Sequence, residues 1–232
     1  MIAIPAATAF APPPGYGEVR QLDLTAPFHT RTPWTMRLLQ PIGADAETGP
    51  KPAKVCLTGG VDAATHCEDI VADGYNFQSI KGAAVEPMSA KAHILGVAVK
   101  AEFGGVAHVL RRTEVWTYNA VTDDFERTSG FSRSDLGDEE RFASGPMDGF
   151  YMVADFLLSG DETRWSDHRY SVEIYRLDPR FGGYIQVLQY LSPGTYRSER
   201  GGPHEVIDGE LARARKMLAA VYPKGLPSDE RP

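Results

Sequence analysis

Two carboxylates occupy matching places in the sequence, and their types and settings could support acid–base chemistry. Glu102 lies between an alanine and a phenylalanine in a β-like run, and Asp155 lies between the same residue types further along. If their strands are neighbours, the carboxylates approach each other and one pKa rises, as a hydrolase or isomerase would require. In the alternative, each carboxylate pairs with an arginine or meets water at a strand end. We favour the alternative, so the pair is a weak catalytic candidate.

Two other groups of polar residues are weaker candidates for a functional site, one for metal binding and one for catalysis. Asp62, His66 and Asp69 have helical spacing, which suits either metal ligands or a solvated helix face. Ser166-Asp167-His168 has the residue types of a catalytic triad, but adjacent residues on a strand point to opposite faces. We therefore expect no metal, no cofactor and no triad.

Aromatic side chains on or beside the expected hairpins are better candidates, for binding rather than catalysis. Aromatic rings with arginine neighbours suit a surface that binds a protein or a glycan. The same rings would also form a cross-strand ladder, which stabilises a sheet without binding anything. The candidate binding residues are Trp116, Tyr118, Trp165, Tyr175 and Phe181.

Composition excludes several classes of partner. The chain has 232 residues, of which 42% are hydrophobic and 24% charged, and its formal net charge is −7. An acidic chain without a basic face is not typical of nucleic-acid binders. No apolar run approaches the roughly 18–20 residues of a membrane-spanning helix. We expect a soluble globular protein with no nucleic-acid partner and no membrane span.

The N-terminus and the two cysteines predict an exported protein. Residues 1–27 read as a disordered Pro/Ala-rich leader and linker, and Ala9-Phe10-Ala11 matches a cleavage-site pattern of export signals. The leader lacks a basic start, so it resembles a truncated signal or simply an apolar extension. Cys56 and Cys67 are expected to form one short-loop disulfide in an oxidising compartment, whereas in the cytosol they would be two buried thiols. We predict a periplasmic or secreted location.

The clearest structural element is a hairpin between Trp165 and Leu191. Two β-branched and aromatic runs flank Asp178-Pro179 and Gly182-Gly183, which are turn residues. In the first run, alternate residues beginning at Tyr170 are apolar, so one face should be buried. The return run is apolar on both faces, so we predict a strand at the centre of a sheet.

Other strands and two helices complete the expected organisation. Apolar alternation or β-branched runs predict strands over 35–39, 53–57, 77–85, 92–103, 109–118, 125–131 and 150–158, the last a buried central strand. The polar segment 132–149 reads as a loop. Ala63 to Val71 is predicted as a short helix, and Pro203 to Tyr222 as a longer one. In the longer helix, one apolar stripe contains Ile207, Leu211, Ala214, Leu218 and Val221.

Two segments of the chain share an order of features, which suggests an internal repeat. Each contains a strand ending in alanine, an acid and phenylalanine, then a loop, a strand with a late tyrosine and a hairpin return. Any two β-meanders would share much of this order, so the repeat is one of two open interpretations. Two or three such units are too few for an ordinary propeller. We predict a mainly β fold, an antiparallel β-sandwich or curled meander, with a short helix and a C-terminal helix packed on the sheet.

The sequence predicts one β-rich domain over residues 28–232, with its closing helix at about 203–222. Its expected function is non-catalytic: an exported domain that binds a protein or glycan through aromatic hairpin surface. A hydrolase or isomerase using Glu102 and Asp155 is one alternative. A structural or assembly role, in which a sheet edge or the helix stripe pairs with another chain, is the other.

Overall fold

A computed structural model describes most of the chain and shows that the described strands form three four-stranded sheets and two short strand pairs. The described residues are 10–43, 51–89, 97–104, 110–156, 160, 162–163, 165–178, 180, 182–197 and 205–222, with the backbone alone at 97–104 and 197. All strand pairs are antiparallel. The predicted mainly β class, with antiparallel sheets and a C-terminal helix, is confirmed.

The three main sheets each have four strands, and in each sheet neighbours in space follow one another along the chain. The first sheet contains β1 (Tyr16–Asp23), β2 (Thr35–Pro41), β3 (Lys54–Gly59) and β4 (Ala64–Asp69). The second contains β7 (Ser79–Pro87), β8 (Val97–Gly104), β9 (Leu110–Asn119) and β10 (Asp124–Ser134). The third contains β11 (Asp138–Phe142), β12 (Phe150–Phe156), β14 (Tyr170–Asp178) and β15 (Gly183–Leu191).

Shorter elements connect or flank these sheets. Two short strand pairs are present, β5 (Val71–Ala72) with β6 (Tyr75–Asn76), and β13 (Asp167–His168) with β16 (Tyr196–Arg197). The helices in the described residues are α1 (Thr25–Phe28), a short 3-10 helix (Gly145–Met147) and α2 (Glu205–Val221). No helix in the described part of the chain is both long and apolar enough to cross a membrane.

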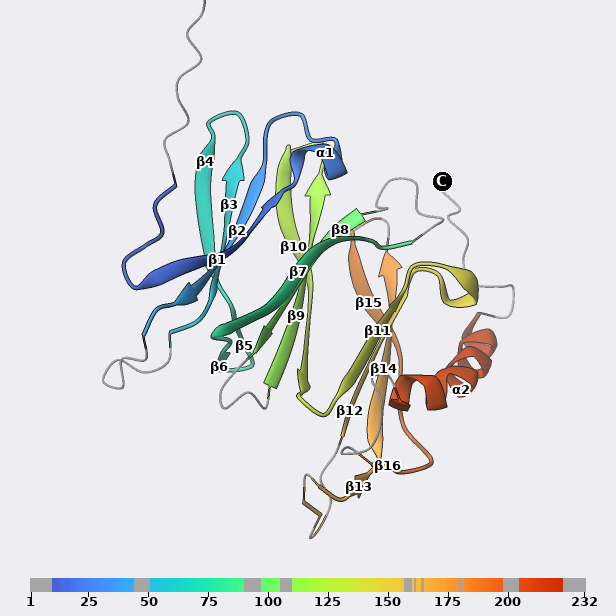
Figure 1. Cartoon of the computed structure of the whole chain (residues 1–232). Coiled ribbons are helices and arrows are strands. Elements are labelled where there is room, and N and C mark those ends of the chain that lie inside the picture. Colours follow the sequence, from blue (N-terminus) through green and yellow to red (C-terminus); the bar gives the residue numbers. More distant parts are fainter. Residues whose placement is uncertain are drawn as a thin grey trace, which may run out of the picture.

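The sheets are stacked in layers, with the second sheet in the middle and α2 on the outside of the third (Figure 1). Because side chains alternate along a strand, β9 contributes side chains to two hydrophobic cores, one on each face of its sheet. Trp116 lies in the core between the first and second sheets, and its neighbour Val115 lies in the core between the second and third. A third core joins the other face of the third sheet to α2. This layering explains why the middle of β9 is buried on both faces.

The hairpin is confirmed, but the predicted place of its return strand is wrong. Tyr170 and Ile174 of β14 are buried in the core under α2, as their alternation predicts. The return strand β15, however, lies at an edge of the third sheet and pairs with β14. It is apolar on both faces because Tyr184 packs toward the second sheet, whereas Leu188 packs toward α2. β12 is the central buried strand that the sequence predicts.

The helix predicted over Ala63–Val71 is wrong, because this segment forms strand β4. Gly60 and Ala63 adopt positive φ at the turn, and β4 then pairs with β3 along its whole length. Cys56 and Cys67 lie opposite each other in this pair and form the expected disulfide. Tertiary pairing therefore overrides the local helical spacing.

Two strands lie where the sequence predicts none. β1 falls inside residues 1–27, so part of the predicted disordered leader is a paired edge strand of the first sheet. β11 falls inside the predicted loop 132–149. Both have few apolar residues, and β11 reads Asp-Glu-Glu-Arg-Phe. Charged residues are typical of edge strands, which do not show the apolar alternation that sequence analysis detects.

The C-terminal helix is confirmed and is tied to the third sheet. The backbone N–H of Ile207 donates to the carboxylate of Asp138 on β11, which satisfies one free donor of the first helical turn. Most of the predicted apolar stripe is buried, but Val221 at its end is half exposed. The proposed repeat corresponds to β8–β9–β10 and β12–β14–β15, which share the connectivity of any antiparallel meander, and it stays a prediction.

Candidate functional site

The two predicted catalytic carboxylates lie on strands of different sheets. Glu102 belongs to β8 of the second sheet and Asp155 to β12 of the third, and the side chain of Glu102 lies outside the described part. Asp155 accepts hydrogen bonds from the backbone N–H (2.8 Å) and the hydroxyl of Ser134. Burial raises the pKa of Asp155 above its ordinary value. Its evident role is to fix the turn from β10 to β11.

The predicted aromatic residues do not share one surface. Trp116 is completely buried, so its assignment to a binding surface is corrected: it is a core residue. The hydroxyl of Tyr118 donates to Asp123, and Tyr175 packs on Phe131 with its hydroxyl bonded to Glu173. Trp165 is 55% exposed, before β13. Phe181 lies outside the described residues.

The weaker polar candidates are also separated. On strand β4, His66 and Asp69 point to opposite faces, and the described residues contain no group of three acids, histidines or cysteines placed to hold a metal. His168 is fully buried, stacked on Phe156 (4.8 Å between ring centroids). The hydroxyl of Ser166 is engaged with Thr163 instead.

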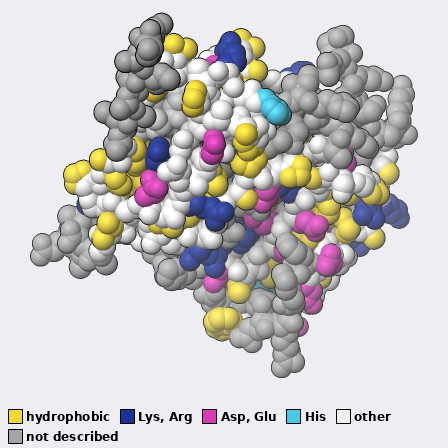
Figure 2. Space-filling model, turned by 45° about the horizontal axis from the view of Figure 1, so that its top comes forward, with side chains coloured by type: hydrophobic (Ala, Val, Ile, Leu, Met, Phe, Trp, Pro, Cys, Tyr) yellow, Lys and Arg dark blue, Asp and Glu magenta, His cyan; other side chains and the backbone are white. Residues whose placement is uncertain are grey.

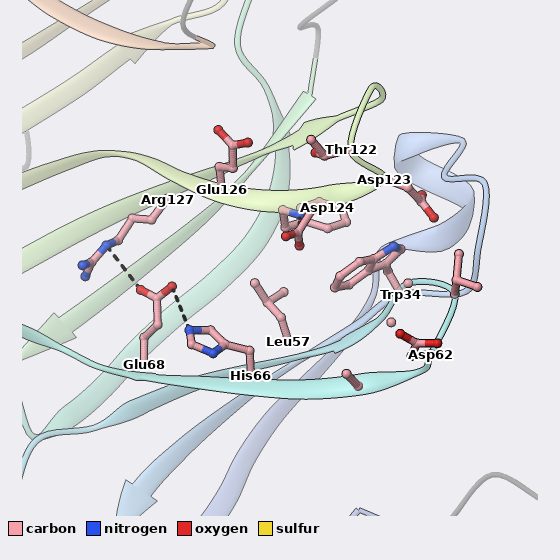
Figure 3. A pocket seen from close by; sticks show the side chains of 15 residues that line it. Trp34, Leu57, Asp62, His66, Glu68, Thr122, Asp123, Asp124, Glu126 and Arg127 are labelled. Atoms are coloured by element: carbon pink, nitrogen blue, oxygen red, sulfur yellow. Dashed lines mark hydrogen bonds and ion pairs between the residues drawn. The ribbon is translucent and has the colours of Figure 1, made fainter.

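A groove of about 640 Å³ lies between the first and second sheets, where β4 and β10 form the sheet edges. Its lining comes from the end of the segment before β2, from β3, β4 and the turn between them, and from the β9–β10 turn and β10 (Figure 3). Both walls are edge strands, because among the described strands β4 pairs with β3 alone and β10 with β9 alone. The groove is therefore flanked by the main-chain edges of two strands as well as by side chains.

The floor of the groove is apolar and closely packed. Trp34, Leu57 and Phe125 line it, and all three are buried core residues whose rings or methyl groups reach the groove surface. A Cβ atom at Gly59 would lie 2.2 Å from the Trp34 ring, so the absence of a side chain there allows the indole to pack on the backbone. The Trp34 and Phe125 rings pack edge to face, with 5.5 Å between their centroids. The floor is thus a fixed surface rather than an exposed aromatic platform.

The walls of the groove carry an excess of negative charge. Five acidic residues line it against one arginine and one histidine; the acids are Asp62, Glu68, Asp123, Asp124 and Glu126. Three of them, Asp62, Asp124 and Glu126, are exposed. The side chain of Glu126 points away from β4 and accepts a hydrogen bond from Asn119 (Figure 3). The groove is therefore an acidic channel above an apolar floor.

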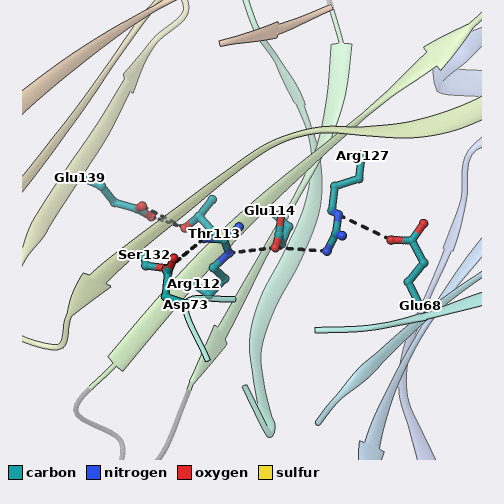
Figure 4. A network of polar contacts seen from close by, with 8 residues as sticks. All are labelled: Glu68, Asp73, Arg112, Thr113, Glu114, Arg127, Ser132 and Glu139. Atoms are coloured by element: carbon teal, nitrogen blue, oxygen red, sulfur yellow. Dashed lines mark hydrogen bonds and ion pairs between the residues drawn. The ribbon is translucent and has the colours of Figure 1, made fainter. Parts of the chain in front are cut away.

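Arg127, the groove's arginine, is already paired on both sides (Figure 4). Its guanidinium lies 3.5 Å from Glu68 on β4 and 3.5 Å from the buried Glu114 on β9. Glu114 also accepts a hydrogen bond from Arg112 at 2.8 Å, and its burial raises its pKa. Arg127 thus crosses between the two sheets and leaves the exposed carboxylates unneutralised.

Asp123 fixes the position of the β9–β10 turn, which forms one end of the groove. Its carboxylate accepts hydrogen bonds from the hydroxyls of Tyr118 and Thr32 and from the backbone N–H of Arg31. These bonds join the β9–β10 turn to the segment before β2. The Tyr118 hydrogen bond holds the pKa of Asp123 below its ordinary value, so the carboxylate is ionised at neutral pH.

The variant Asp123→Asn should therefore lose stability in a pH-dependent way. A carboxyl whose folded pKa is lowered stabilises the fold above its ordinary pKa of about 4, and this contribution disappears as pH falls through the lowered value. Urea unfolding at pH 7 and pH 3 should show a deficit for the variant at pH 7 that shrinks at pH 3. Asparagine tolerates the positive φ of 56° at this position, so the backbone is preserved. The exposed neighbour, changed as Asp124→Asn, is the control; an equal deficit at both pH values would contradict the role of ionised Asp123.

Comparison of the chain with models of protein families, with curated proteins and with solved structures gave no match. The function must therefore be argued from the groove. In the sequence, Asp62 and His66 stand out only as part of a set with helical spacing that suits a metal, and no pattern distinguishes the carboxylates around Asp123. The only sequence signal was the placing of acids at two separate turns, which does not show that the turns meet.

Proposed function

We propose that the chain is an exported, non-catalytic binding domain whose groove between β4 and β10 takes an extended, positively charged segment of a partner protein. The observation that supports it most is the excess of acidic residues along a channel whose two walls are edge strands. An extended segment can pair its main chain with such an edge while alternate side chains reach the walls. Lysine or arginine side chains would then meet Asp62 and Asp124.

Several observations favour a protein over the other partner classes. Sugar rings stack on exposed aromatic faces, whereas Trp34 and Phe125 are 6% and 5% exposed. Acidic, basic and hydrophobic side chains are interspersed on the face shown in Figure 2, without the continuous basic area that nucleic acids require. The carboxylate-pair enzyme receives no support, because β8 and β12 lie in different sheets.

The disulfide supports export as part of the same proposal. Cys56 and Cys67 join β3 to β4, the strand that forms one wall of the groove. Disulfides of this structural kind persist in oxidising compartments, so a periplasmic or secreted location fits. The groove would then act on a partner outside the cytosol.

Peptide titration tests the proposed function. The probe is a labelled ten-residue peptide of alternating lysine and valine, followed by fluorescence anisotropy at about 0.15 M salt, where the Debye length is about 8 Å. A peptide of alternating glutamate and valine is the reference. We expect the lysine peptide to bind, and the double variant Asp62→Asn/Asp124→Asn to weaken it by roughly 5–30-fold, since exposed charge pairs contribute about 0.5–1 kcal/mol each.

A matched double variant removes the same charge elsewhere. Glu18→Gln/Asp69→Asn changes two exposed acids of the first sheet that do not line the groove. It should leave the affinity for the lysine peptide within about twofold, because surface charges at a distance are screened. Equal weakening by both double variants, or equal binding of the glutamate peptide, would overturn the proposal.

A further inference from the structure

A row of alternating charges runs from the β5–β6 turn, over the second sheet, to one wall of the groove (Figure 4). It begins at Asp73, whose carboxylate lies 4.0 Å from Arg112, and Arg112 donates to the buried Glu114 at 2.8 Å. The row continues through Arg127, which lies 3.5 Å from Glu114 and 3.5 Å from Glu68 on β4. Three acids therefore alternate with two arginines, and the row has one negative charge in excess.

His66 lies at the groove end of this row (Figure 3). Its Nε2 atom is 3.7 Å from Oε1 of Glu68, whereas Arg127 approaches Oε2 of the same carboxylate. Alternate residues of β4 line the groove, so His66 and Glu68 point to the same side of the strand. The His66 side chain is 76% exposed, so protons from solvent reach it. A protonated imidazole would supply the positive charge that balances the row.

The charged groups around His66 determine what a proton there does to the groove. They come from β4, the β3–β4 turn, the β9–β10 turn and β10, and they are Glu68, Asp62, Asp123, Asp124, Glu126 and Arg127. Glu126 is turned toward Asn119, and Arg127 is paired with Glu68. An imidazolium would therefore add its charge beside the carboxylates that a cationic segment meets. Imidazole is the side-chain group that ordinarily gains its proton between pH 8 and pH 5, whereas ordinary carboxyl groups do so at lower pH.

We propose that His66 makes binding in the groove pH-dependent, so that a cationic segment is held while His66 is neutral and released when His66 is protonated. This inference rests on the proposed function, because it concerns the same groove and the same class of partner. Two effects of the proton act in the same direction. The imidazolium repels lysine and arginine side chains, and it pairs with Glu68, which is then less available to them.

Titration of the labelled lysine–valine peptide at pH 7.5 and pH 5.5, at constant ionic strength, tests the inference. We expect the wild-type chain to bind it about two- to fivefold more weakly at pH 5.5, which is the effect of one exposed charge pair. His66→Asn stays neutral, so it should lose most of this difference and keep the wild-type affinity at pH 7.5. His66→Lys is charged at both pH values, so it should bind weakly at both.

A second histidine provides the matched control. His29 is exposed and does not line the groove, and asparagine tolerates its positive φ of 50°. His29→Asn should therefore keep the full pH-dependence of the wild-type chain. Far-UV circular dichroism at both pH values checks that all the variants are folded.

The possible outcomes separate this inference from the proposed function. Equal wild-type affinity at the two pH values would overturn the inference and leave the proposed function standing, because the peptide still binds. A pH-dependence that His66→Asn retains in full would also overturn the inference, because carboxyl groups alone would then explain the change. Absence of binding at pH 7.5 would overturn the proposed function and the inference together.

Discussion

The variant Trp116→Ala should lose about 3–5 kcal/mol of unfolding free energy, as large aromatic deletions in packed cores do. Trp116 is completely buried in the core between the first and second sheets. That core also contains Trp34 and Phe125, whose rings line the groove floor. Domains of this kind are stable by about 5–15 kcal/mol, so the loss is a large share of the total. Urea unfolding followed by circular dichroism measures it as a lower midpoint.

A second tryptophan provides the control for this prediction. Trp165 is 55% exposed and lies before β13, so Trp165→Ala should change the unfolding free energy by less than about 0.5 kcal/mol. The comparison separates burial from residue type, because the same side chain is removed in both variants. If the two variants lost similar stability, the layered packing of the first and second sheets would be contradicted.

Removing the carboxylate of Glu139, which is buried between the second and third sheets, should lower the free energy of unfolding by a similar amount. Glu139 on β11 accepts hydrogen bonds from the hydroxyls of Thr113 (2.9 Å) and Tyr151, and Arg133 lies 3.5 Å away. Burial raises the pKa of Tyr151 well above its ordinary value, so its hydroxyl keeps the proton that it donates. Glu139→Ala leaves these groups buried without their acceptor. The expected loss is about 3–5 kcal/mol, the usual cost of breaking a buried pair.

Two further variants show whether this loss comes from the buried network. Glu139→Gln keeps one carbonyl acceptor and should lose less than Glu139→Ala in the same urea experiment. Glu18→Ala removes a glutamate that also pairs with an arginine, Arg37 at 3.3 Å, but on an exposed strand. That loss should stay below about 1 kcal/mol, as for other surface ion pairs. A loss for Glu139→Ala no larger than for Glu18→Ala would show that the network does not hold the second and third sheets together.

Local pattern and tertiary structure contributed differently to the third sheet. Alternation in β14 and the turn residues after it predicted the hairpin, because side-chain direction along a strand depends only on the strand itself. The same pattern placed β15 at the centre of a sheet, since burial on two faces usually indicates a central strand. In the structure, different layers cover its two faces at different positions, and its outer edge is open. The periodicity of apolar residues indicates which faces of a strand are buried, but it does not indicate how many neighbouring strands are hydrogen-bonded to it.

The amino-acid sequence by itself determined the mainly β class, the hairpin, the closing helix and the pairing of Cys56 with Cys67. These depend on residue periodicity, turn residues and cysteine number, all of which are local or countable. Only the tertiary structure decided that 64–69 is a strand, that Trp116 is a core residue and that Glu102 and Asp155 belong to different sheets. It alone brought Asp62 of one turn and Asp123 of another to the same groove. The physical reason is that such contacts join elements distant along the chain, and their formation depends on how whole sheets pack rather than on any local pattern.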